Sequence, residues 1–466
     1  MEPTGGRALD PRRWSRRLSR REFLQTTGAV ALVASAGPVL AACGGGGGGG
    51  GGKQLKILQW SHFVPRYDDW FGGYVKQWGD DNGVAVTVDH IDLADLSART
   101  TAEINAGQGH DLIELLSPPS AFEPSAYDLT DVNKDAEKQF GQQLGLCKNS
   151  TFNPTTGKYY GFCHGWVPDA GDYRKSQWEK VGLADGPSTW DDLMTGGTQI
   201  KQQANVRMGI GMSQEIDSNM AARALIWSFG GSEQDENENV VINSPEVVDA
   251  VDYMARLFQS TMTNEVFSWT ASSNNEGLIS GELSYVLNSI SAYRSAQDAS
   301  PDVADDVFFT KALRGPGGTG VVSAHVIPIY IVPKFSKNLD TAQRFLLDLV
   351  KNYADAVNNS ELYNFPAFPS TAPKLNDWLQ NDPFGSKPSD KLAVLQGAEQ
   401  WSTNVGHPGP ANAAIGEVFG TFVLPNMMAS AARGQASPQD AVTSAESQIK
   451  PIFDKWRTKG LVGGGS

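Results

Sequence analysis

Short apolar runs alternate with helix-like stretches near the start of the patterned part of the chain. Three runs rich in apolar and β-branched residues are predicted strands: Leu55–Trp60, Val84–Val88 and Asp111–Leu116. Two stretches between them are predicted helices: 68–81 and 96–105. This alternation predicts a parallel sheet with helices on its faces. Because such sheets bind ligands at the carboxyl ends of their strands, the residues after Trp60 and around Glu114 are candidates for a site.

The later part of the chain is richer in helical patterns. Ser188–Leu193 and Ser244–Glu246 have the signature of helix starts, with a hydroxyl cap followed by acidic residues or proline. Residues 325–334 form an apolar run that predicts a strand. The next helix, 341–350, would turn Ala342, Phe345 and Leu346 inward, and residues 411–457 are mostly helical in pattern.

The first 42 residues have the pattern of an export signal. They begin with an arginine-rich stretch, continue through an apolar segment at 26–42 and end on small residues. Ser19–Leu24 resembles the twin-arginine motif, and Leu40–Cys43 resembles the bacterial lipobox. The resemblance implies cleavage before Cys43 and lipidation of its thiol; otherwise Cys43 is an ordinary thiol in a cleaved signal.

A glycine run follows the predicted lipidation site. Residues 43–52 consist of Cys43 and nine glycines, which behave as flexible coil with a typical reach of roughly 17 Å. We therefore expect a folded domain held near a membrane by lipid, with no second anchor, because no later stretch has 18 continuous apolar residues.

Length and charge narrow the functional classes. One hydrophobic core rarely accommodates 466 residues, so two lobes are expected. The formal net charge of −14 argues against nucleic-acid binding, which needs basic residues to neutralise phosphates. It also disfavours adhesion to anionic lipid.

Cys147 and Cys163 flank a segment with turn signals at Asn153–Pro154 and Thr156–Gly157. In an oxidising compartment we expect them to form a disulfide, which would contribute roughly 3 kcal/mol. A metal pair is the alternative, although two cysteines alone are too few for a zinc site. No metal site and no cofactor are predicted.

A set of motifs, in order along the chain, resembles the extracellular solute-binding proteins of bacterial ABC importers, of the sugar-binding type called family 1. The motifs are "GKYYGF", "DYRKSQWEKVGLADGPSTWDDL", "FGGSEQDENENVVINSPEVVDAVDYM", "EGLISGELSYVLNS", "IVPKFSKNLDTAQRFLLDL" and "ARGQASPQDAVTSAESQI". Two positions depart from the family pattern: Cys163, where proline is common, and Arg174, where asparagine is usual.

The resemblance implies an α/β, two-lobed periplasmic-binding-protein-like fold of type II, with a hinge and a ligand cleft between the lobes. Lobe 1 is expected to comprise residues 53–163 and 321–357, and lobe 2 residues 164–320 and 358–466. It further implies a monomer that is not an enzyme. Such a receptor binds a mono- or oligosaccharide reversibly and delivers it to ABC permease subunits supplied by other chains.

Aromatic platforms and hydrogen-bonding side chains suit a sugar's apolar faces and hydroxyl rim. Ten residues near strand ends, predicted crossovers or family binding loops are candidates: Trp60, His62, Glu114, Trp166, Asp169, Glu215, Asn288, Tyr293, His325 and Phe365. For three of them a purely structural role is the alternative to ligand binding. Trp60 can be part of the core, Glu114 can pair with a helix N-terminus, and Phe365 can pack beneath the cleft.

Two other functions stay open. The same fold could bind a polyamine or another cation, which the acidic residues would suit. An exported glycoside hydrolase would need two carboxylates about 5–9.5 Å apart across a cleft. The enzyme motifs Gly-x-Ser-x-Gly, His-Glu-x-x-His and the phosphate loop are missing from the sequence, which makes the hydrolase the weaker alternative.

Overall fold

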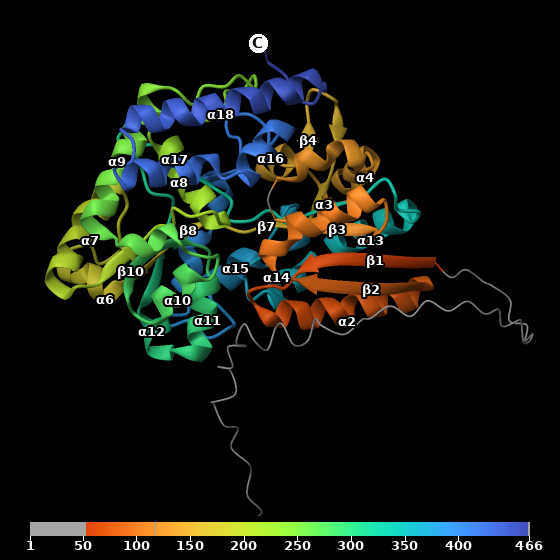
Figure 1. The fold of residues 1–466 in the computed structure, drawn as a ribbon. Helices are drawn as coiled ribbons and strands as arrows, with labels where there is room; N and C mark the ends of the chain where they lie inside the picture. Colours follow the sequence, from red (N-terminus) through yellow and green to blue (C-terminus); the bar gives the residue numbers. More distant parts are fainter. Residues whose placement is uncertain (1–52, 117, 465–466) are drawn as a thin grey trace, which may run out of the picture. The chain divides into compact units, whose positions relative to one another are not determined.

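A computed structural model describes residues 53–116 and 118–464 (Figure 1). The expected export signal, Cys43 and the glycine run lie outside the described residues. The helices and strands of the first part are β1 (Lys53–Trp60), α2 (Pro65–Asn82), β2 (Val84–Ile91), α3 (Leu96–Ala106), β3 (Leu112–Leu115), α4 (Thr130–Phe140), α5 (Gly145–Asn149), β4 (Phe152–Asn153), β5 (Lys158–Tyr159), β6 (Phe162–Cys163) and β7 (Gly165–Trp166).

The first sheet has the order β2-β1-β3-β13-β6, where β13 is Ile329–Ile331. β1 pairs in parallel with β2 and β3, which confirms the predicted parallel core, whereas β13 runs antiparallel to β3 and β6. The predicted strand at 325–334 is shorter than expected. Pro328 and Pro333 flank β13, and proline has no N–H for the ladder.

Helix α2 shows why the local sequence folds as it does. It begins with Pro65 in the first turn and ends at Gly83, whose φ of 64° is the left-handed conformation that glycine adopts easily. Its buried face carries Tyr67, Phe71 and Trp78, spaced for one side of a helix. The helix therefore packs its apolar side inward and places Tyr67 close to the end of β1.

The second sheet has the order β11-β8-β10-β9. β8 runs antiparallel to β10 and β11, and β9 runs parallel to β10. Its helices and strands are β8 (Ala170–Arg174), α6 (Lys175–Trp178), α7 (Trp190–Ala204), β9 (Arg207–Gly209), α8 (Ile216–Ser228), α9 (Pro245–Thr261), α10 (Ser273–Ile279), β10 (Leu283–Asn288), α11 (Ser291–Ala299), α12 (Pro301–Asp306) and β11 (Val307–Thr310). The predicted starts of α7 and α9 are confirmed, with Thr189 and Ser244 as their caps.

Three segments connect the two sheets and contact one another. The first runs from β6 through β7 to β8, the second from β11 to β13, and the third passes through β14 (Phe365–Pro366), which pairs with β7. In the first two, Val167 N donates to Val326 O at 2.9 Å, and His325 N donates to Val167 O at 2.8 Å. These crossing segments form the expected connection between two halves, whose exact residue boundaries stay a prediction.

The C-terminal part is mostly helical, as predicted. Its remaining elements are β12 (Val322–Ser323), α13 (Leu339–Lys351), α14 (Tyr353–Asn359), α15 (Leu375–Gln380), β15 (Ser402–Thr403), α16 (Ala413–Gly420), α17 (Val423–Ala432) and α18 (Pro438–Thr458). Ala342, Phe345 and Leu346 of α13 are fully buried, as the pattern predicted. α17 and α18 pack against α9 (Figure 1).

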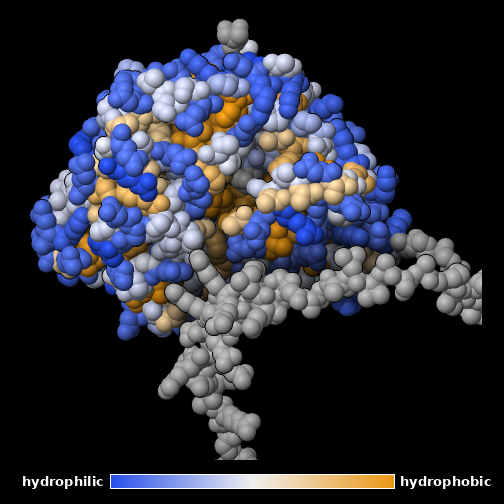
Figure 2. Space-filling model, in the orientation of Figure 1, coloured by the Kyte–Doolittle hydropathy of each residue, from blue (hydrophilic) through white to orange (hydrophobic). Residues whose placement is uncertain are grey.

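The face drawn in Figure 2 is mainly hydrophilic, with apolar residues in small groups. Among the described residues, Val241 is the one large apolar side chain classed as exposed, at 38%. The described surface therefore has little apolar area to offer a partner.

The predicted disulfide between Cys147 and Cys163 is wrong for this structure, in which both are free, buried thiols. The Cys163 thiol donates to Gly165 O at 3.1 Å. Burial, and then the neighbouring Cys163, raise the pKa of the Cys147 thiol well above its usual range. The thiol form is thereby favoured over the thiolate, which is the species that forms disulfides.

Candidate ligand-binding site

The sequence candidates come from three places that the fold brings together. Trp60 ends β1, Asn288 ends β10, and Glu215 lies between β9 and α8, so these three follow strands that run parallel in their sheets. Trp166, Asp169, His325 and Phe365 lie on or beside the crossing segments. Strand ends from both sheets therefore meet the connections between them, where ligands of such folds bind.

His62 lies in a buried group of rings just past β1. Its ring is 4.8 Å from Trp60, 4.5 Å from Tyr67 and 5.0 Å from Tyr363, between centroids. Burial lowers the pKa of His62 to about 3, so the imidazole is neutral at ordinary pH. Nδ1 accepts from Val64 N at 2.9 Å, which leaves the proton on Nε2, 3.5 Å from Asn364 Oδ1.

His325 lies between two carboxylates. Its Nδ1 is 3.0 Å from Asp169 Oδ1, and its Nε2 is 3.7 Å from Asp217 Oδ1. Burial alone would lower the pKa of His325, but the charges of Asp217 and Asp169 outweigh burial and raise it. Burial raises the pKa of Asp217 to about 6, against the opposing effect of His325. His325 is therefore held between acids from α8 and from the first crossing segment, and these acids favour its protonated form.

Amide side chains extend this group, which we call the central polar cluster: Asp169, Asp217, Asn274 and His325. Asn274 Nδ2 donates to Asp217 Oδ2 at 2.6 Å. The next residue, Asn275, accepts from Asn288 Nδ2 at 2.5 Å, which links the end of β10 to the cluster. Amide groups both donate and accept, as a polyhydroxylated ligand requires.

Glu215 serves the local fold as well as the site. Its carboxylate caps α8 by accepting from Asp217 N at 2.7 Å, from Ser218 N at 2.5 Å and from the Ser218 hydroxyl. Burial, and then Asp217, raise the pKa of Glu215 to about 8. This cap fixes Asp217 in the first turn of α8 and so positions it toward His325.

Trp166 and Phe365 face each other on the paired strands β7 and β14. Their ring centroids are 5.4 Å apart at 73°, an edge-to-face contact. Trp166 is 1% exposed, and its Nε1 has no hydrogen-bond partner. A buried indole N–H without a partner is uncommon and marks a position where a ligand or water can accept.

Glu114 lies behind His62, at the end of β3. Its Oε1 is 2.8 Å from His164 Nε2, and both side chains are buried. Oε2 of Glu114 and the hydroxyl of Tyr67 have no hydrogen-bond partner. Because Tyr67 also stacks on His62, these unpartnered atoms are connected to the ring group rather than isolated in the core.

Tyr293 is the exception among the ten candidates. It lies on α11, where its hydroxyl donates to Ser386 Oγ at 2.7 Å and its ring packs edge-on against Phe309 at 5.4 Å. In these contacts Tyr293 packs with Ser386 and Phe309, and none of them involves another of the ten candidates.

Several residues of the site had no separate sequence signal: Tyr67, His164, Asp217, Asn274, Asn275, Tyr363 and Asn364. Asp217 lies two residues after Glu215 in the same candidate loop and could have been included. The others lie on helices or loops whose facing direction only the packing defines.

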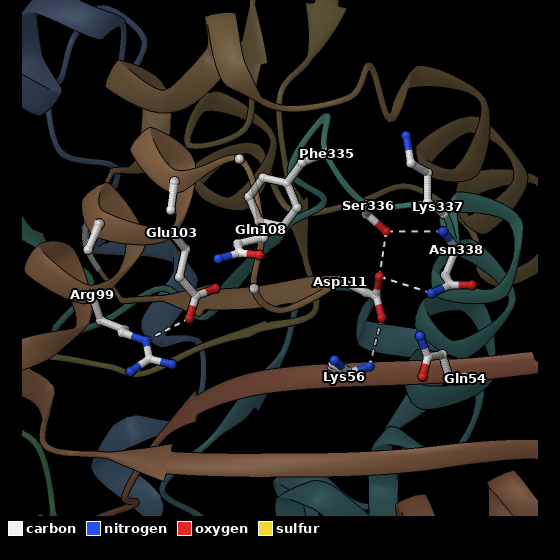
Figure 3. Close-up of a pocket in the computed structure, with 14 residues that line it drawn as sticks. Gln54, Lys56, Arg99, Glu103, Gln108, Asp111, Phe335, Ser336, Lys337 and Asn338 are labelled. Atoms are coloured by element: carbon white, nitrogen blue, oxygen red, sulfur yellow. Dashed lines mark hydrogen bonds and ion pairs between the residues drawn. The ribbon is translucent and has the colours of Figure 1, made fainter. Parts of the chain in front are cut away.

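A separate cavity of about 620 Å³ lies at the opposite edge of the first sheet (Figure 3). It involves Lys56, in the first half of β1, and Asp111, just before β3. Asp111 accepts from Lys56 N at 2.9 Å, from Ser336 Oγ at 2.7 Å and from Asn338 Nδ2 at 3.1 Å. Its carboxylate is thus already satisfied, and this edge is the amino end of the parallel strands.

Metal-ligand clusters and membrane-spanning helices are both absent from the described residues. No group of three or more His, Cys, Asp or Glu side chains has an arrangement suited to a metal ion. None of the helices in 53–116 and 118–464 is both long and apolar enough to cross a membrane.

Solved structures share this fold. MalE3 of T. maritima with maltose bound is 20% identical and covers 86% of this chain and 99% of its own, with a TM-score of 0.70. A solute-binding protein of Agrobacterium radiobacter with ribitol is 19% identical (86% and 99% covered, TM-score 0.70). A sugar transporter protein of Arthrobacter chlorophenolicus with laminaribiose is 16% identical (86% and 99%, TM-score 0.70).

Comparison with the curated proteins finds no match. A family model described as bacterial extracellular solute-binding protein matches residues 73–384, well over half of the chain. With two sheets, three crossing segments and a buried polar group where they meet, the chain belongs to the family of bacterial extracellular solute-binding proteins.

Proposed function

We propose that this protein binds a carbohydrate reversibly between its two sheets and delivers it to the permease of an ABC importer. The observation that carries the proposal is the convergence of ring faces and hydrogen-bonding side chains at the crossing segments. His62, Trp166 and Tyr363 offer rings, and the central polar cluster offers donors and acceptors. This combination matches the apolar faces and hydroxyl rim of a sugar.

The ligands of the structurally similar proteins support this choice. Those proteins were solved with maltose, ribitol and laminaribiose, all polyhydroxylated molecules. At these levels of identity the likeness concerns the fold, so the choice of carbohydrate rests on the side chains of this chain.

Binding requires motion, because the site is buried. His62, Asp169 and His325 are each at most 5% exposed. A ligand can therefore enter only when the two sheets move apart, and the paired crossing segments are the natural hinge. Ligand contacts from both sides then stabilise the closed form, and release reverses the motion without covalent chemistry.

The family is extracellular, so the protein is exported. We further propose that the lipobox-like segment places lipid on Cys43 and that the following glycines tether the domain as a monomer to the outer side of the cell membrane. The permease is supplied by other chains.

Isothermal titration against a panel of neutral mono- and oligosaccharides, with putrescine and spermidine included, tests the proposal. We expect one or more carbohydrates to bind. Trp166→Phe, which removes only the unpartnered indole N–H and some ring area, should weaken that binding about tenfold, as expected for loss of one buried hydrogen bond. Trp78→Phe, another buried tryptophan that packs on Phe345 away from the site, is the matched control and should bind normally.

If polyamines bind and no carbohydrate does, the ligands of this protein are polyamines and the proposed carbohydrate class is wrong. If the protein releases product from a glycoside, it is a hydrolase and not a receptor. Equal effects of Trp166→Phe and Trp78→Phe would show that the affinity loss reflects general destabilisation and not the site.

A further inference from the structure

The site holds more acidic groups than cations. Asp169, Asp172, Asp217 and Glu215 are all buried, and His325 is the cation nearest to them. In the part of the chain that the structure describes, no lysine or arginine forms an ion pair with any of these four carboxyl groups. Carboxyl groups buried without such a partner are costly to ionise away from water.

Two buried acids elsewhere in this protein are paired with arginine. Glu233 receives two bonds from Arg223, at 3.1 and 2.9 Å, and Asp382 receives two from Arg294, at 2.8 and 3.2 Å. These four side chains are at most 2% exposed, like those of the site. Some buried acids of this protein therefore have an arginine partner, whereas the four carboxyl groups of the site have none.

Acceptor atoms in the site also lack donors. Asp169 uses Oδ1 for His325, while its Oδ2 has no partner, although the side chain is 1% exposed. Asp172, on β8 just beyond the first crossing segment, is fully buried, and neither of its carboxylate oxygens has a partner. Buried carboxylates without donors are rare in folded proteins and call for a group that the chain itself does not supply.

We propose that the bound carbohydrate carries a protonated amino group, which donates to the unpartnered Oδ2 of Asp169 at the edge of the central polar cluster. This inference rests on the proposed function and narrows its substrate class to amino sugars. An ammonium group has three donors and one positive charge, so it satisfies Asp169 Oδ2 and balances the excess acid together with His325. The rings of Trp166 and Tyr363 remain available for the sugar face.

From the pKa values of the same carboxyl groups we expect that binding of an amine releases protons from the site. Burial, then the charge of Asp169, raise the pKa of Asp172 well above its usual range. The pKa values of Asp217 and Glu215 are raised to about 6 and about 8, and the facing groups are His325, Asn274 and Tyr363. An arriving ammonium favours the ionised carboxylates, so its binding should release protons, whereas a neutral sugar should release none.

The experiment compares a β-1,4-linked glucosamine disaccharide with its N-acetylated form and with cellobiose, by titration calorimetry in buffers of different ionisation enthalpy. Putrescine is the amine without a sugar. We expect the free amine form to bind about tenfold more tightly than either neutral disaccharide, with proton release seen as a buffer-dependent enthalpy. Asp169→Asn and Asp217→Asn should reduce the preference for the amine over cellobiose to within about threefold, and the exposed Asp252→Asn should leave this preference and the proton release unchanged.

Each outcome separates this inference from the function on which it rests. If cellobiose or the acetylated form binds as tightly as the amine, the amino-sugar assignment is wrong. The proposed carbohydrate receptor is then still supported. Putrescine binding with no disaccharide bound overturns the carbohydrate receptor. If the preference for the amine persists in both Asp→Asn variants, the ammonium binds elsewhere and the proposed geometry is wrong.

Discussion

At the residue scale, the site is an arrangement of ionisable groups whose charges depend on one another. Burial lowers the pKa of His62 and keeps it neutral, whereas Asp217 and Asp169 raise the pKa of His325 against the effect of burial. The two histidines differ because carboxylates surround only the second one. Among the acids, Glu215 and Asp217 have pKa values close to neutral pH, so the stability of the site depends on pH.

Glu215→Gln should change the pH dependence of stability. Because the folded-state pKa is raised, from 4.5 to about 8, Glu215 favours the folded state most below pH 4.5, and this contribution is lost as pH rises through 8. Between these values the wild type should lose up to roughly 1.4 kcal/mol per pH unit relative to the variant. Urea unfolding at several pH values measures the difference, and parallel curves for the two proteins would contradict it.

The exposed Asp252→Asn is the control for this comparison. Its carboxylate pairs with Arg256 on the surface of α9, far from any buried acid. It should therefore reproduce the wild-type slope.

At the element scale, helix starts position the functional groups. The Glu215 cap fixes the first turn of α8 and thereby Asp217, and a capping box fixes the start of α7. In that box Asp192 N donates to Thr189 Oγ1 at 3.0 Å, and Thr189 N donates to Asp192 Oδ2 at 3.0 Å. The start of α7 was predicted from the sequence, because capping depends on residues within one turn; the Glu215 cap of α8 was not.

Thr189→Ala removes one half of the α7 capping box. The Asp192 N–H loses its acceptor, so the free energy of unfolding should fall by about 1 kcal/mol, measured by chemical denaturation. Gln203→Ala, at an exposed position near the end of the same helix, is the matched control and should leave stability unchanged or slightly higher. A loss below a few tenths of a kcal/mol, or the same loss in the control, would argue against the capping role.

At the scale of the whole molecule, two sheets that fold from separate parts of the chain share one buried site. His62 follows strand β1 of the first sheet, and Asp217 follows strand β9 of the second sheet. Crossing segments that pair with each other keep both sides in register. Ligand binding should therefore restrain both sides at once.

Hydrogen–deuterium exchange of the full chain checks this coupling. With ligand at about 100 times its Kd, the closed form gains about 2.7 kcal/mol, so amides exposed by opening should exchange about 100-fold more slowly. We expect this slowing both at 61–64, where Val64 N is bonded to His62, and at 215–218, where Asp217 N is bonded to Glu215. The outer helix α18 serves as the unaffected reference, and slowing confined to one segment would contradict closure.

The sequence by itself determined the parallel core of the first sheet and the starts of α7 and α9, because strand pattern and helix capping are local properties. The site residues that it named near strand ends and crossovers stay predictions. It could not place Tyr293, the thiols of Cys147 and Cys163, or Tyr363 and Asn274. Their surroundings are set by segments distant in the chain, as when His325 meets Asp169 across 156 positions. Only the tertiary structure decided which acids are buried without a cation, because burial and pairing depend on packing between elements and not on sequence spacing.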